Sequence, residues 1–351
     1  MARNTRAALH LLLIAVFSFA VSACGGGGGG VTPGAGDAPA PGFRAAAPVS
    51  PLLYVSNLGA NTSVASITAY SLDANGNAAP VNTIGGSKTF LNGPQGVAFD
   101  ALGNMYVTNA AQCGACSTAH VAVFAPGSTG NAVPIAVICG PHTNLSSPVG
   151  VAVDASGELL VVNEGSNSVT VYAPGANGDA APIRTIAGPS TQLSFPQGIA
   201  IDSSGLVYVA NGGGSGGVNV YDAGASGDAA PVRTIPPAFA APAFTFSSAV
   251  AFDKSGNLYV AGTASGIRGF LAIYAPGSNT PSAQIAGTNT GLDAPDGVAL
   301  DAAGNAYVTN NSCFPCHVLV FAPGSNGNAA PARTISGDAT GLSFPTGDAI
   351  H

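Results

Sequence analysis

The sequence predicts an all-β fold because one unit recurs along residues 52–351, and each unit contains several short strand-forming runs. Two further observations specify the architecture. Each copy has four such runs joined by Gly- and Pro-rich turns, and the last copy stops after its first run, which is the run that the first copy lacks. Four strands at a period of roughly 50 residues are typical of propeller blades. We therefore predict a six-bladed β-propeller.

The repeat is marked by an aspartate that follows a short apolar strand. In the copy Gly96-Val-Ala-Phe-Asp100 and the next four copies, the aspartates are spaced by 54, 48, 51 and 48 residues. Each opens an Asp-x-x-Gly turn, in which we expect Asp to accept backbone hydrogen bonds and Gly to be left-handed. A metal role is disfavoured because one aspartate per blade is too dispersed to share an ion. The five are Asp100, Asp154, Asp202, Asp253 and Asp301.

The remaining strands follow in a fixed order. A second strand such as 105–109 is followed by a variable loop and a third strand such as 169–172. The segment Ala-Pro-Gly-x-x-Gly-Asn/Asp-Ala-x-Pro then leads to a fourth strand such as 183–186. No innermost strand precedes 53–57, and only an innermost strand, 346–350, remains at the end. We expect the C-terminal strand to join the N-terminal blade, which closes the ring and removes open sheet edges.

The blade motif Pro-x-Gly-Val/Ile-Ala-x-Asp-x-x-Gly-x-x-Tyr-Val resembles the NHL repeat. Tyr106-Val-Thr-Asn109 and Tyr307-Val-Thr-Asn310 resemble the related YVTN surface-protein repeat. The resemblance covers about residues 52–351 and implies the propeller fold. It implies no single activity, because lyases, lactonases and binding proteins share this fold.

Residues 1–23 have the features of an export signal. Arg3 and Arg6 precede an apolar run that is too short to span a membrane. Val21-Ser-Ala-Cys24 resembles the lipobox of bacterial lipoproteins, which implies cleavage before Cys24 and acylation of its thiol; ordinary secretion is the alternative. Residues 24–51, rich in Gly, Pro and Ala, predict a flexible tether. We expect a lipid anchor in the bacterial cell envelope, at the outer membrane or cell surface.

Charge and aromatic content narrow the classes of partner. Without Arg3 and Arg6, seven Lys and Arg oppose sixteen Asp and Glu, a net charge of −9. Nucleic-acid binding requires clustered positive charge, so a nucleic-acid partner is not expected. Trp is absent and all nine Tyr occupy two repeated strand positions, which leaves few aromatic platforms for a sugar. Carbohydrate binding is therefore disfavoured.

An enzyme with this fold would work at the mouth of the central channel. By resemblance, lactonase-like propellers hold a metal there with several carboxylates and amides, and lyase propellers use His-centred sites. Asp296 lies at this mouth, and Asp348 replaces a Val or Ile of the other copies. Two carboxylates are a thin ligand set for Ca²⁺, so we predict no catalytic residues. The residues that begin the innermost strands are Gln95, Val149, Gln197, Ser248, Asp296 and Thr346.

Two cysteine pairs precede third strands. Cys313-Phe-Pro-Cys316-His317 has the spacing of a c-type haem attachment site. The equivalent Cys113-Gly-Ala-Cys116 has three further residues before His120, so it breaks that signature. Two local disulfides explain both loops in an oxidising compartment, and haem at Cys313, Cys316 and His317, or another metal or redox role, stays an alternative.

The predicted ring geometry separates the two cysteine pairs. They flank blade 1 and should lie on the order of 17 Å apart, which disfavours one zinc site between them. The remaining cysteine of the propeller, Cys139, takes the place of Ala or Ser in other copies. We therefore expect Cys139 to be a small buried residue with a free thiol.

The loop-bearing face is the candidate binding surface, because loops on rigid scaffolds usually carry recognition. The loop 236–246 departs from the repeat and adds apolar bulk at Phe239 and Phe244, either as an exposed patch or packed over the blade. We predict a non-catalytic module that binds a protein or small ligand. The alternatives are a propeller lyase or lactonase with a metal near the channel, and a structural envelope protein without a ligand. The candidate face contains His120, His142, Phe239, Phe244, Asp296 and His317.

Overall fold

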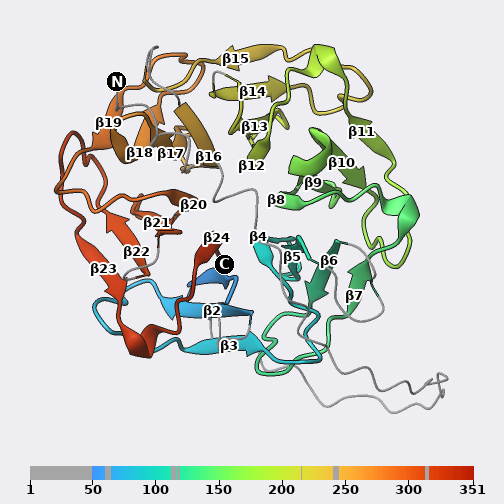
Figure 1. Cartoon of the computed structure of the whole chain (residues 1–351), viewed down its shortest axis with the longest axis horizontal. Coiled ribbons are helices and arrows are strands. Elements are labelled where there is room, and N and C mark those ends of the chain that lie inside the picture. Colours follow the sequence, from blue (N-terminus) through green and yellow to red (C-terminus); the bar gives the residue numbers. More distant parts are fainter. Residues whose placement is uncertain are drawn as a thin grey trace, which may run out of the picture.

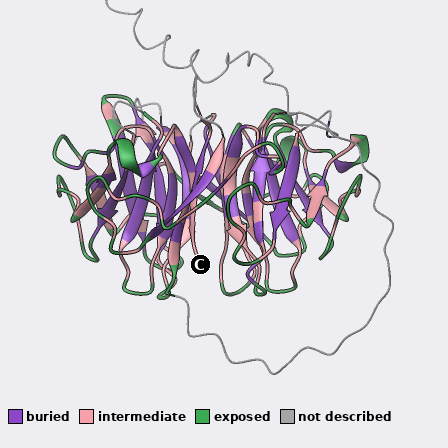
Figure 2. Ribbon diagram, turned by 90° about the horizontal axis from the view of Figure 1, so that it is seen from below, coloured by how far each residue is buried: buried purple, intermediate pink, exposed green. Residues whose placement is uncertain are grey.

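The structure, a computed structural model, describes residues 50–59, 65–111, 116, 119–214, 216–239, 245–312 and 316–351. Six four-stranded antiparallel sheets form a ring around a central axis, where the sequence predicts the channel, which confirms the all-β, six-bladed propeller (Figure 1). The buried residues lie between two faces made of exposed loops (Figure 2). Within the described ranges, no helix has the length and apolar character needed to cross a membrane.

The blades follow one another along the chain, and each consists of four strands ordered from the channel outward. Blade 1 contains β24 (Pro345–Ile350), β1 (Leu52–Asn57), β2 (Ser66–Ser71) and β3 (Asn82–Gly85). Blade 2 contains β4 (Pro94–Phe99), β5 (Met105–Asn109), β6 (His120–Phe124) and β7 (Ala136–Ile138). Blade 3 contains β8 (Pro148–Val153), β9 (Leu159–Asn163), β10 (Ser168–Tyr172) and β11 (Arg184–Ile186).

The second half of the ring has the same order. Blade 4 contains β12 (Pro196–Ile201), β13 (Val207–Asn211), β14 (Val218–Tyr221) and β15 (Arg233–Ile235). Blade 5 contains β16 (Thr245–Phe252), β17 (Leu258–Ala264), β18 (Ile267–Tyr274) and β19 (Ala283–Ala286). Blade 6 contains β20 (Pro295–Leu300), β21 (Ala306–Asn310), β22 (His317–Phe321) and β23 (Arg333–Ser336). The described residues also form the short 3₁₀ helices η1 (Pro141–Thr143), η2 (Glu164–Ser166), η3 (Pro189–Thr191) and η4 (Asp338–Thr340).

The ring closes as the sequence predicts. β24 pairs antiparallel with β1, with Leu53 opposite Ile350, so the last strand is the innermost strand of blade 1. Leu52 N donates to His351 O at 2.8 Å, and the His351 ring stacks on Phe99 of blade 2 with ring centroids 4.5 Å apart. The C-terminal strand therefore contacts blades on both sides of the closure.

The innermost strands contact each other directly around the channel. A Cβ atom added at Gly96 would lie 2.5 Å from Val149 O of blade 3, and one at Gly347 would lie 2.5 Å from Gln95 O of blade 2. Any larger side chain would push neighbouring blades apart, which explains why glycine recurs in the Gly-Val-Ala-x-Asp motif. We call the face at which innermost strands begin the top face, and the face with the Asp-x-x-Gly turns the bottom face.

The Asp-x-x-Gly turns have the structural role that the sequence predicts. Asp100 Oδ1 accepts hydrogen bonds from Leu102 N and Asn104 N, both at 2.9 Å, and Gly103 is left-handed with φ 81°. Tyr106 OH donates to Asp100 Oδ2 at 3.2 Å. The repeated aspartates and the second-strand tyrosines thus stabilise the bottom turns.

A repeated contact, which we call the latch, joins the outer edges of neighbouring blades. Between blades 3 and 4, Gly227 N donates to Thr185 O at 2.7 Å and Ala187 N donates to Gly227 O at 3.0 Å. Asp228 Oδ1 accepts a third hydrogen bond from Ser190 N at 2.7 Å. Five of the six interfaces carry this arrangement, through Asn77, Asn131, Asp179, Asp228 and Asn328.

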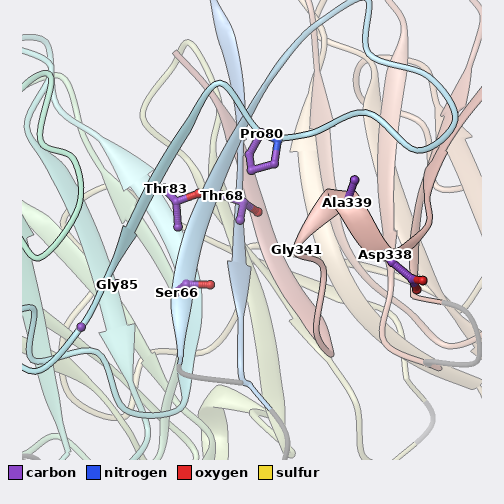
Figure 3. Close-up of a pocket in the computed structure, with 9 residues that line it drawn as sticks. Ser66, Thr68, Pro80, Thr83, Gly85, Asp338, Ala339 and Gly341 are labelled. Atoms are coloured by element: carbon purple, nitrogen blue, oxygen red, sulfur yellow. The ribbon is translucent and has the colours of Figure 1, made fainter. Parts of the chain in front are cut away.

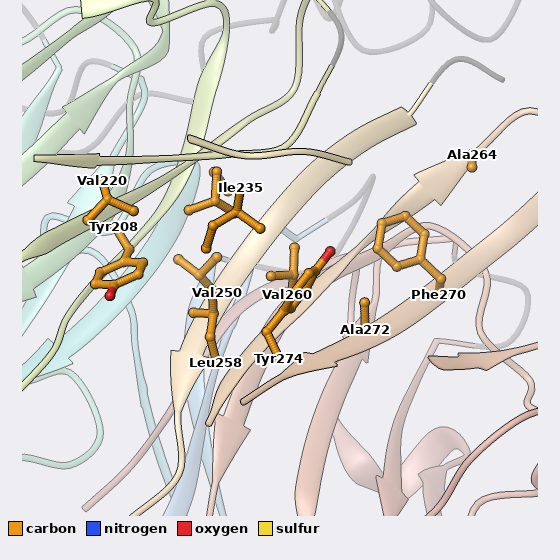
Figure 4. Close-up of a cluster of buried hydrophobic side chains, with 12 residues drawn as sticks. Tyr208, Val220, Ile235, Val250, Leu258, Val260, Ala264, Phe270, Ala272 and Tyr274 are labelled. Atoms are coloured by element: carbon orange, nitrogen blue, oxygen red, sulfur yellow. The ribbon is translucent and has the colours of Figure 1, made fainter. Parts of the chain in front are cut away.

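The interface between blades 4 and 5 shows no latch within the described residues. The segment from Ala275 to Ile285 has 11 residues where blade 3 has 14, and the Gly-Asn/Asp pair is missing from it. Phe239 packs edge-on against buried Phe270, with ring centroids 5.1 Å apart, and Gln284 Nε2 donates to Ala238 O at 2.8 Å. Apolar side chains of the two blades face each other at this interface (Figure 4), among them Tyr208, Val220, Ile235, Val250, Leu258 and Phe270.

Candidate functional site

Two of the residues that begin innermost strands join neighbouring blades. Thr346 is buried, and its Oγ1 donates to Pro94 O of blade 2 at 3.0 Å. Ser248 is also buried and donates to Pro295 O of blade 6 at 2.5 Å. Both hydroxyls therefore have a structural role, which leaves Gln95 of blade 2, Gln197 of blade 4 and Asp296 of blade 6 as the other polar residues that begin innermost strands.

Asp296 occupies the position in blade 6 that the sequence singles out. Asn311 Nδ2 donates to Asp296 Oδ2 at 2.8 Å, and the Asn311 backbone N donates to Ala294 O at 3.0 Å. Burial raises the pKa of the Asp296 carboxyl, and the hydrogen bond from Asn311 offsets part of that rise. Asn311 follows β21, so one blade supplies both the carboxyl and the amide that orients it.

Glu164 provides a second carboxyl from blade 3, which lies across the ring from blade 6 (Figure 1). It begins η2 directly after β9, and its backbone N donates to Ser147 O at 3.2 Å. Gln197 of blade 4 hydrogen-bonds its side chain. Burial is the main cause that raises the pKa of Glu164, and the negative charge of Asp296 raises it further.

Asp348 provides a third carboxyl from β24 and stands opposite Val55 of β1. Both of its carboxyl oxygens are buried and have no hydrogen-bond partner among the described residues. Its Oδ1 lies 2.6 Å from where a Cβ of Gly297 would be, beside Asp296. Burial, followed by the charge of Asp296, raises the pKa of Asp348 well above its usual value.

These carboxyls do not provide a metal-ligand set. In the part of the chain that the structure describes, no three His, Cys, Asp or Glu side chains are grouped to hold one metal ion. The expected pair of Asp296 and Asp348 does interact electrostatically, but it leaves most of the six to eight oxygen ligands of Ca²⁺ unsupplied. No chemical step is therefore assigned to a metal.

The described histidines of the candidate face have partners away from the channel carboxyls. His120 is buried, with Nε2 2.6 Å from Phe90 O. His142 is exposed, and its Nδ1 lies 2.6 Å from Asp179 Oδ2. His317 Nε2 lies 3.2 Å from Gly291 O. Thus Asp296 belongs to the channel mouth, and the three histidines do not share a site with it.

The predicted pairing of Cys113 with Cys116 and the predicted free thiol of Cys139 are wrong. Cys116 is bonded to Cys139, with Cα atoms 5.7 Å apart, so the Cys113–Cys116 pair does not form and Cys139 is not free. Cys113 lies outside the described residues. The sequence could not show this pairing, because the loop before β6 meets the end of β7 only after blade 2 has formed. Cys139 takes the place of Ala or Ser at a strand end that this loop reaches.

Cys316 is also in a disulfide, and Cys313 lies outside the described residues. The Cys316 Sγ accepts a hydrogen bond from Phe344 N at 3.4 Å. Attachment of haem at Cys313, Cys316 and His317 would require this sulfur for a thioether bond. The disulfide occupies that sulfur, so the arrangement does not fit a c-type haem.

The sequence allows Phe239 either to form an exposed patch or to pack over the blade. In the structure it packs, because its ring contacts Phe270 in the blade 4–blade 5 interface. Phe244 lies outside the described residues. A different aromatic residue, Phe195, directly precedes β12 and is 57% exposed, and its ring lies beside Gly213 in the loop after β13. Sequence reasoning did not single it out.

Two surface hollows lie away from the channel carboxyls. The first, of about 470 Å³, lies between the outer strands of blade 1 and the loop after blade 6 (Figure 3). Hydroxyls of Ser66, Thr68 and Thr83 line it, with Asp338 as its acidic residue. The second, of about 300 Å³, lies at the bottom face between blades 3 and 4 and includes Asp154 and Asp202. Both aspartates already act in Asp-x-x-Gly turns.

Comparison with known proteins shows the fold only. No protein-family model and no curated protein matches the chain. A periplasmic gluconolactonase of Pseudomonas aeruginosa is similar in structure, with a TM-score of 0.60 at 13% identity over 86% of this chain and 98% of that one. A protein of unknown function from Bacteroides caccae matches with a TM-score of 0.56 at 11% identity, over 86% and 99%. At these identities the chain shares a six-bladed propeller with both.

Glu164 and Asn311 are the functional candidates that the sequence reasoning missed. Both directly follow the Asn that ends a second strand, at Asn163 and Asn310. The equivalent residues in blades 1, 2 and 4 are Leu58, Ala110 and Gly212. Polar residues at this one repeat position could therefore have indicated which blades contribute to the mouth.

Proposed function

We propose that this protein is an exported, non-catalytic binding module that holds a ligand at the top-face mouth of its central channel. The observation that carries this proposal is the pair of carboxyl–carboxamide contacts where innermost strands begin, Asp296 with Asn311 of blade 6 and Glu164 of blade 3 with Gln197 of blade 4, whose carboxyls also interact electrostatically. Groups with strongly perturbed pKa values in one place are candidates for a functional site. Rigid blades with variable mouth residues suit recognition more than they suit a defined chemical step.

A binding role is favoured over catalysis by the partners of these carboxyls. Gln197 and Asn311 are carboxamides, which position Glu164 and Asp296 but cannot exchange protons with a substrate near neutral pH. The described histidines have partners elsewhere, so among the described residues only carboxyls are the titratable groups that we assign to the mouth. The Pseudomonas gluconolactonase shares the fold, and a lactonase-type activity with a metal near the channel is the alternative that this similarity suggests.

The test measures ligand binding and lactone hydrolysis on the same exported protein. Thermal unfolding is followed with separate additions of amino acids, alkylamines, sugars, gluconate and CaCl₂, while hydrolysis of glucono-1,5-lactone is followed with and without divalent metals. We expect at least one organic class to raise the unfolding temperature, and Asp296→Asn to remove that increase. Metal-dependent lactone hydrolysis that Asp296→Asn abolishes would establish the enzyme alternative.

We further propose that a lipid on Cys24 holds the propeller at the bacterial cell envelope, where residues 24–51 act as the tether. Support comes from the lipobox-like sequence before Cys24 and the following Gly run. We expect the protein in the membrane fraction, with diacylglyceryl mass on its N-terminal residue, and Cys24→Ser in the soluble exported fraction. Recovery of the wild-type protein in the soluble fraction would leave the propeller as an unanchored secreted module.

A further inference from the structure

Large apolar side chains are exposed at one repeat position of four neighbouring blades. This position directly precedes the fourth strand and follows a Pro in every blade. Its side chain is more than half exposed in blades 1 to 4, whereas blades 5 and 6 have Ser282 and Ala332 there. The four exposed residues are Val81, Ile135, Ile183 and Val232.

The position lies at the level of the bottom turns. Ile135 N donates to Val123 O at 2.8 Å, one residue from the end of β6. That end, Phe124, pairs with Met105, which begins β5 after the Asp-x-x-Gly turn of blade 2. Equivalent hydrogen bonds of 2.8 Å place the other three residues at the same level of their blades.

Blade 2 adds a fifth exposed apolar residue in its bottom turn. Leu102 lies within the Asp-x-x-Gly sequence and is 81% exposed. The equivalent residues of the other four turns are small, namely Ser156, Ser204, Ser255 and Ala303. Leu102 and the four residues at the repeat position form what we call the bottom arc, which extends over blades 1 to 4.

The chain that precedes β1 joins the propeller beside Leu102. Leu52, the first residue of β1, exchanges backbone hydrogen bonds with His351 at 2.8 and 3.1 Å. A Cβ atom added at Gly103 would lie 2.9 Å from His351 Nε2, so this pair lies against the turn that carries Leu102. The proposed tether is therefore attached at the bottom face, next to the bottom arc.

We infer that the bottom arc is a membrane-docking surface, which lies against phospholipid when the acyl group of Cys24 is inserted in the bilayer. This inference rests on the proposed lipid anchor and specifies which face of the propeller meets the membrane. It also directs the top-face mouth away from the membrane, where a ligand can reach it.

The length of the tether makes a weak contact sufficient. Residues 24–51, as a flexible tether, reach about 30 Å root-mean-square, so the anchored propeller meets lipid at a high effective concentration. The contact gains from the apolar area that the arc buries in the interface. The net charge of −9 without the signal opposes an anionic surface, so we expect docking on neutral phospholipid.

The test uses a single Trp as a reporter, because the chain has none of its own. Leu102→Trp places it in the bottom arc, and Phe195→Trp is the matched control at an exposed aromatic position of the top face. Ser255→Trp is a second control, at the same turn position of blade 5 and outside the arc.

The lipidated variants are reconstituted in vesicles of phosphatidylcholine and phosphatidylethanolamine, with and without lipids that carry bromine on their acyl chains. Bromine quenches only Trp that enters the bilayer interface. We expect Leu102→Trp to be quenched by roughly a factor of two or more relative to Phe195→Trp, and Ser255→Trp to be quenched less than Leu102→Trp.

The outcomes separate the docking surface from the anchor. Equal quenching of Leu102→Trp and Phe195→Trp in anchored protein would overturn the inference and leave the anchor in place. Equal quenching of Leu102→Trp and Ser255→Trp would overturn the assignment to the arc. Soluble dimers of Cys24→Ser that Leu102→Ser dissociates would assign the arc to a second copy. Wild-type protein without lipid would overturn anchor and inference together.

Discussion

The blade 3–blade 4 interface and the blade 4–blade 5 interface are built differently. The first uses the latch, in which Asp228 Oδ1 and two backbone hydrogen bonds of Gly227 join the outer edges. The second shows no latch in the described residues and instead buries Phe270 against Phe239. Blades 3 and 4 are thus connected at their outer edges by polar hydrogen bonds, whereas blades 4 and 5 are connected by apolar packing.

The difference shows that a blade can lose the Gly-Asn/Asp pair of the latch where apolar packing against its neighbour takes the place of the lost hydrogen bonds. Blade 5 has the shortened outer turn, and it also has longer β16, β17 and β18, of eight, seven and eight residues. Blade 4 and blade 2 have innermost strands of six residues. Longer strands enlarge the apolar contact with blade 4 (Figure 4), which compensates for the missing hydrogen bonds.

The largest expected effect comes from breaking the apolar interface. Phe270→Ala removes a fully buried ring and should lower the free energy of unfolding by about 3–5 kcal/mol. Urea denaturation measures this, and hydrogen exchange should show faster opening in β16 to β18 than in β8 to β10. A loss below about 1 kcal/mol would mean that the rings do not replace the latch.

Cys139 takes part in the latch between blades 2 and 3 and is also tied covalently within blade 2, because its N donates to Gly178 O at 2.9 Å and its sulfur is bonded to Cys116 in the loop before β6. Cys139→Ala should lower the free energy of unfolding by about 2–4 kcal/mol under oxidising conditions. Under reducing conditions the variant and the wild type should differ little. Peptide mapping of the unreduced protein checks the pairing, and a Cys113–Cys116 peptide would contradict it.

Asp348 places an unfavourable group inside a latched interface, between blades 6 and 1. Asp348→Val restores the residue type of Val97 and Val298 and should raise the free energy of unfolding at pH 7 by about 1–3 kcal/mol.

The effect of Asp348→Val should depend on pH with a definite sign. The folded-state pKa of Asp348 is raised, so between the unfolded value and the folded value only the unfolded state is ionised. Wild-type stability therefore falls as pH rises through that window, and the advantage of the variant grows over the same window and is smallest below it. An advantage that is equal at pH 3 and pH 7 would contradict the assigned burial.

The smallest effect is expected for one latch residue. Asp228→Ala removes the acceptor of Ser190 N and should lower the free energy of unfolding by about 1 kcal/mol. Asp228→Asn keeps an Oδ1 acceptor, as Asn131 and Asn328 do at equivalent positions, and should be close to wild type. Similar losses in the two variants, measured by urea denaturation, would show that charge and not capping stabilises the latch.

The sequence predicted features that repeat and missed contacts that form between elements. The Asp-x-x-Gly turns and the β24–β1 closure were predicted because each depends on local spacing or on counting copies. The Gly-Asn/Asp-Ala-x-Pro segment was recognised only as a connection, because its partner atoms belong to the preceding blade. The Cys116–Cys139 pairing was missed for the same reason.

The candidate site was predicted in part. Asp296 and Asp348 were identified because they break the repeat at positions where the other blades carry different residues. Glu164 was not, because its importance depends on facing Asp296 across the ring. Phe195 also escaped notice, although its left-handed φ recurs at the same repeat position in Ser147, Ala294 and Phe344.

The pairing of β24 with β1 has a consequence for synthesis. A ribosome delivers β1 first and β24 last, so β1 lacks its inner neighbour until nearly the whole chain has been made. A prematurely terminated product would keep that edge open and remain susceptible to proteases and to aggregation. The pairing of β24 with β1 is thus the step that turns an open array of blades into a closed ring.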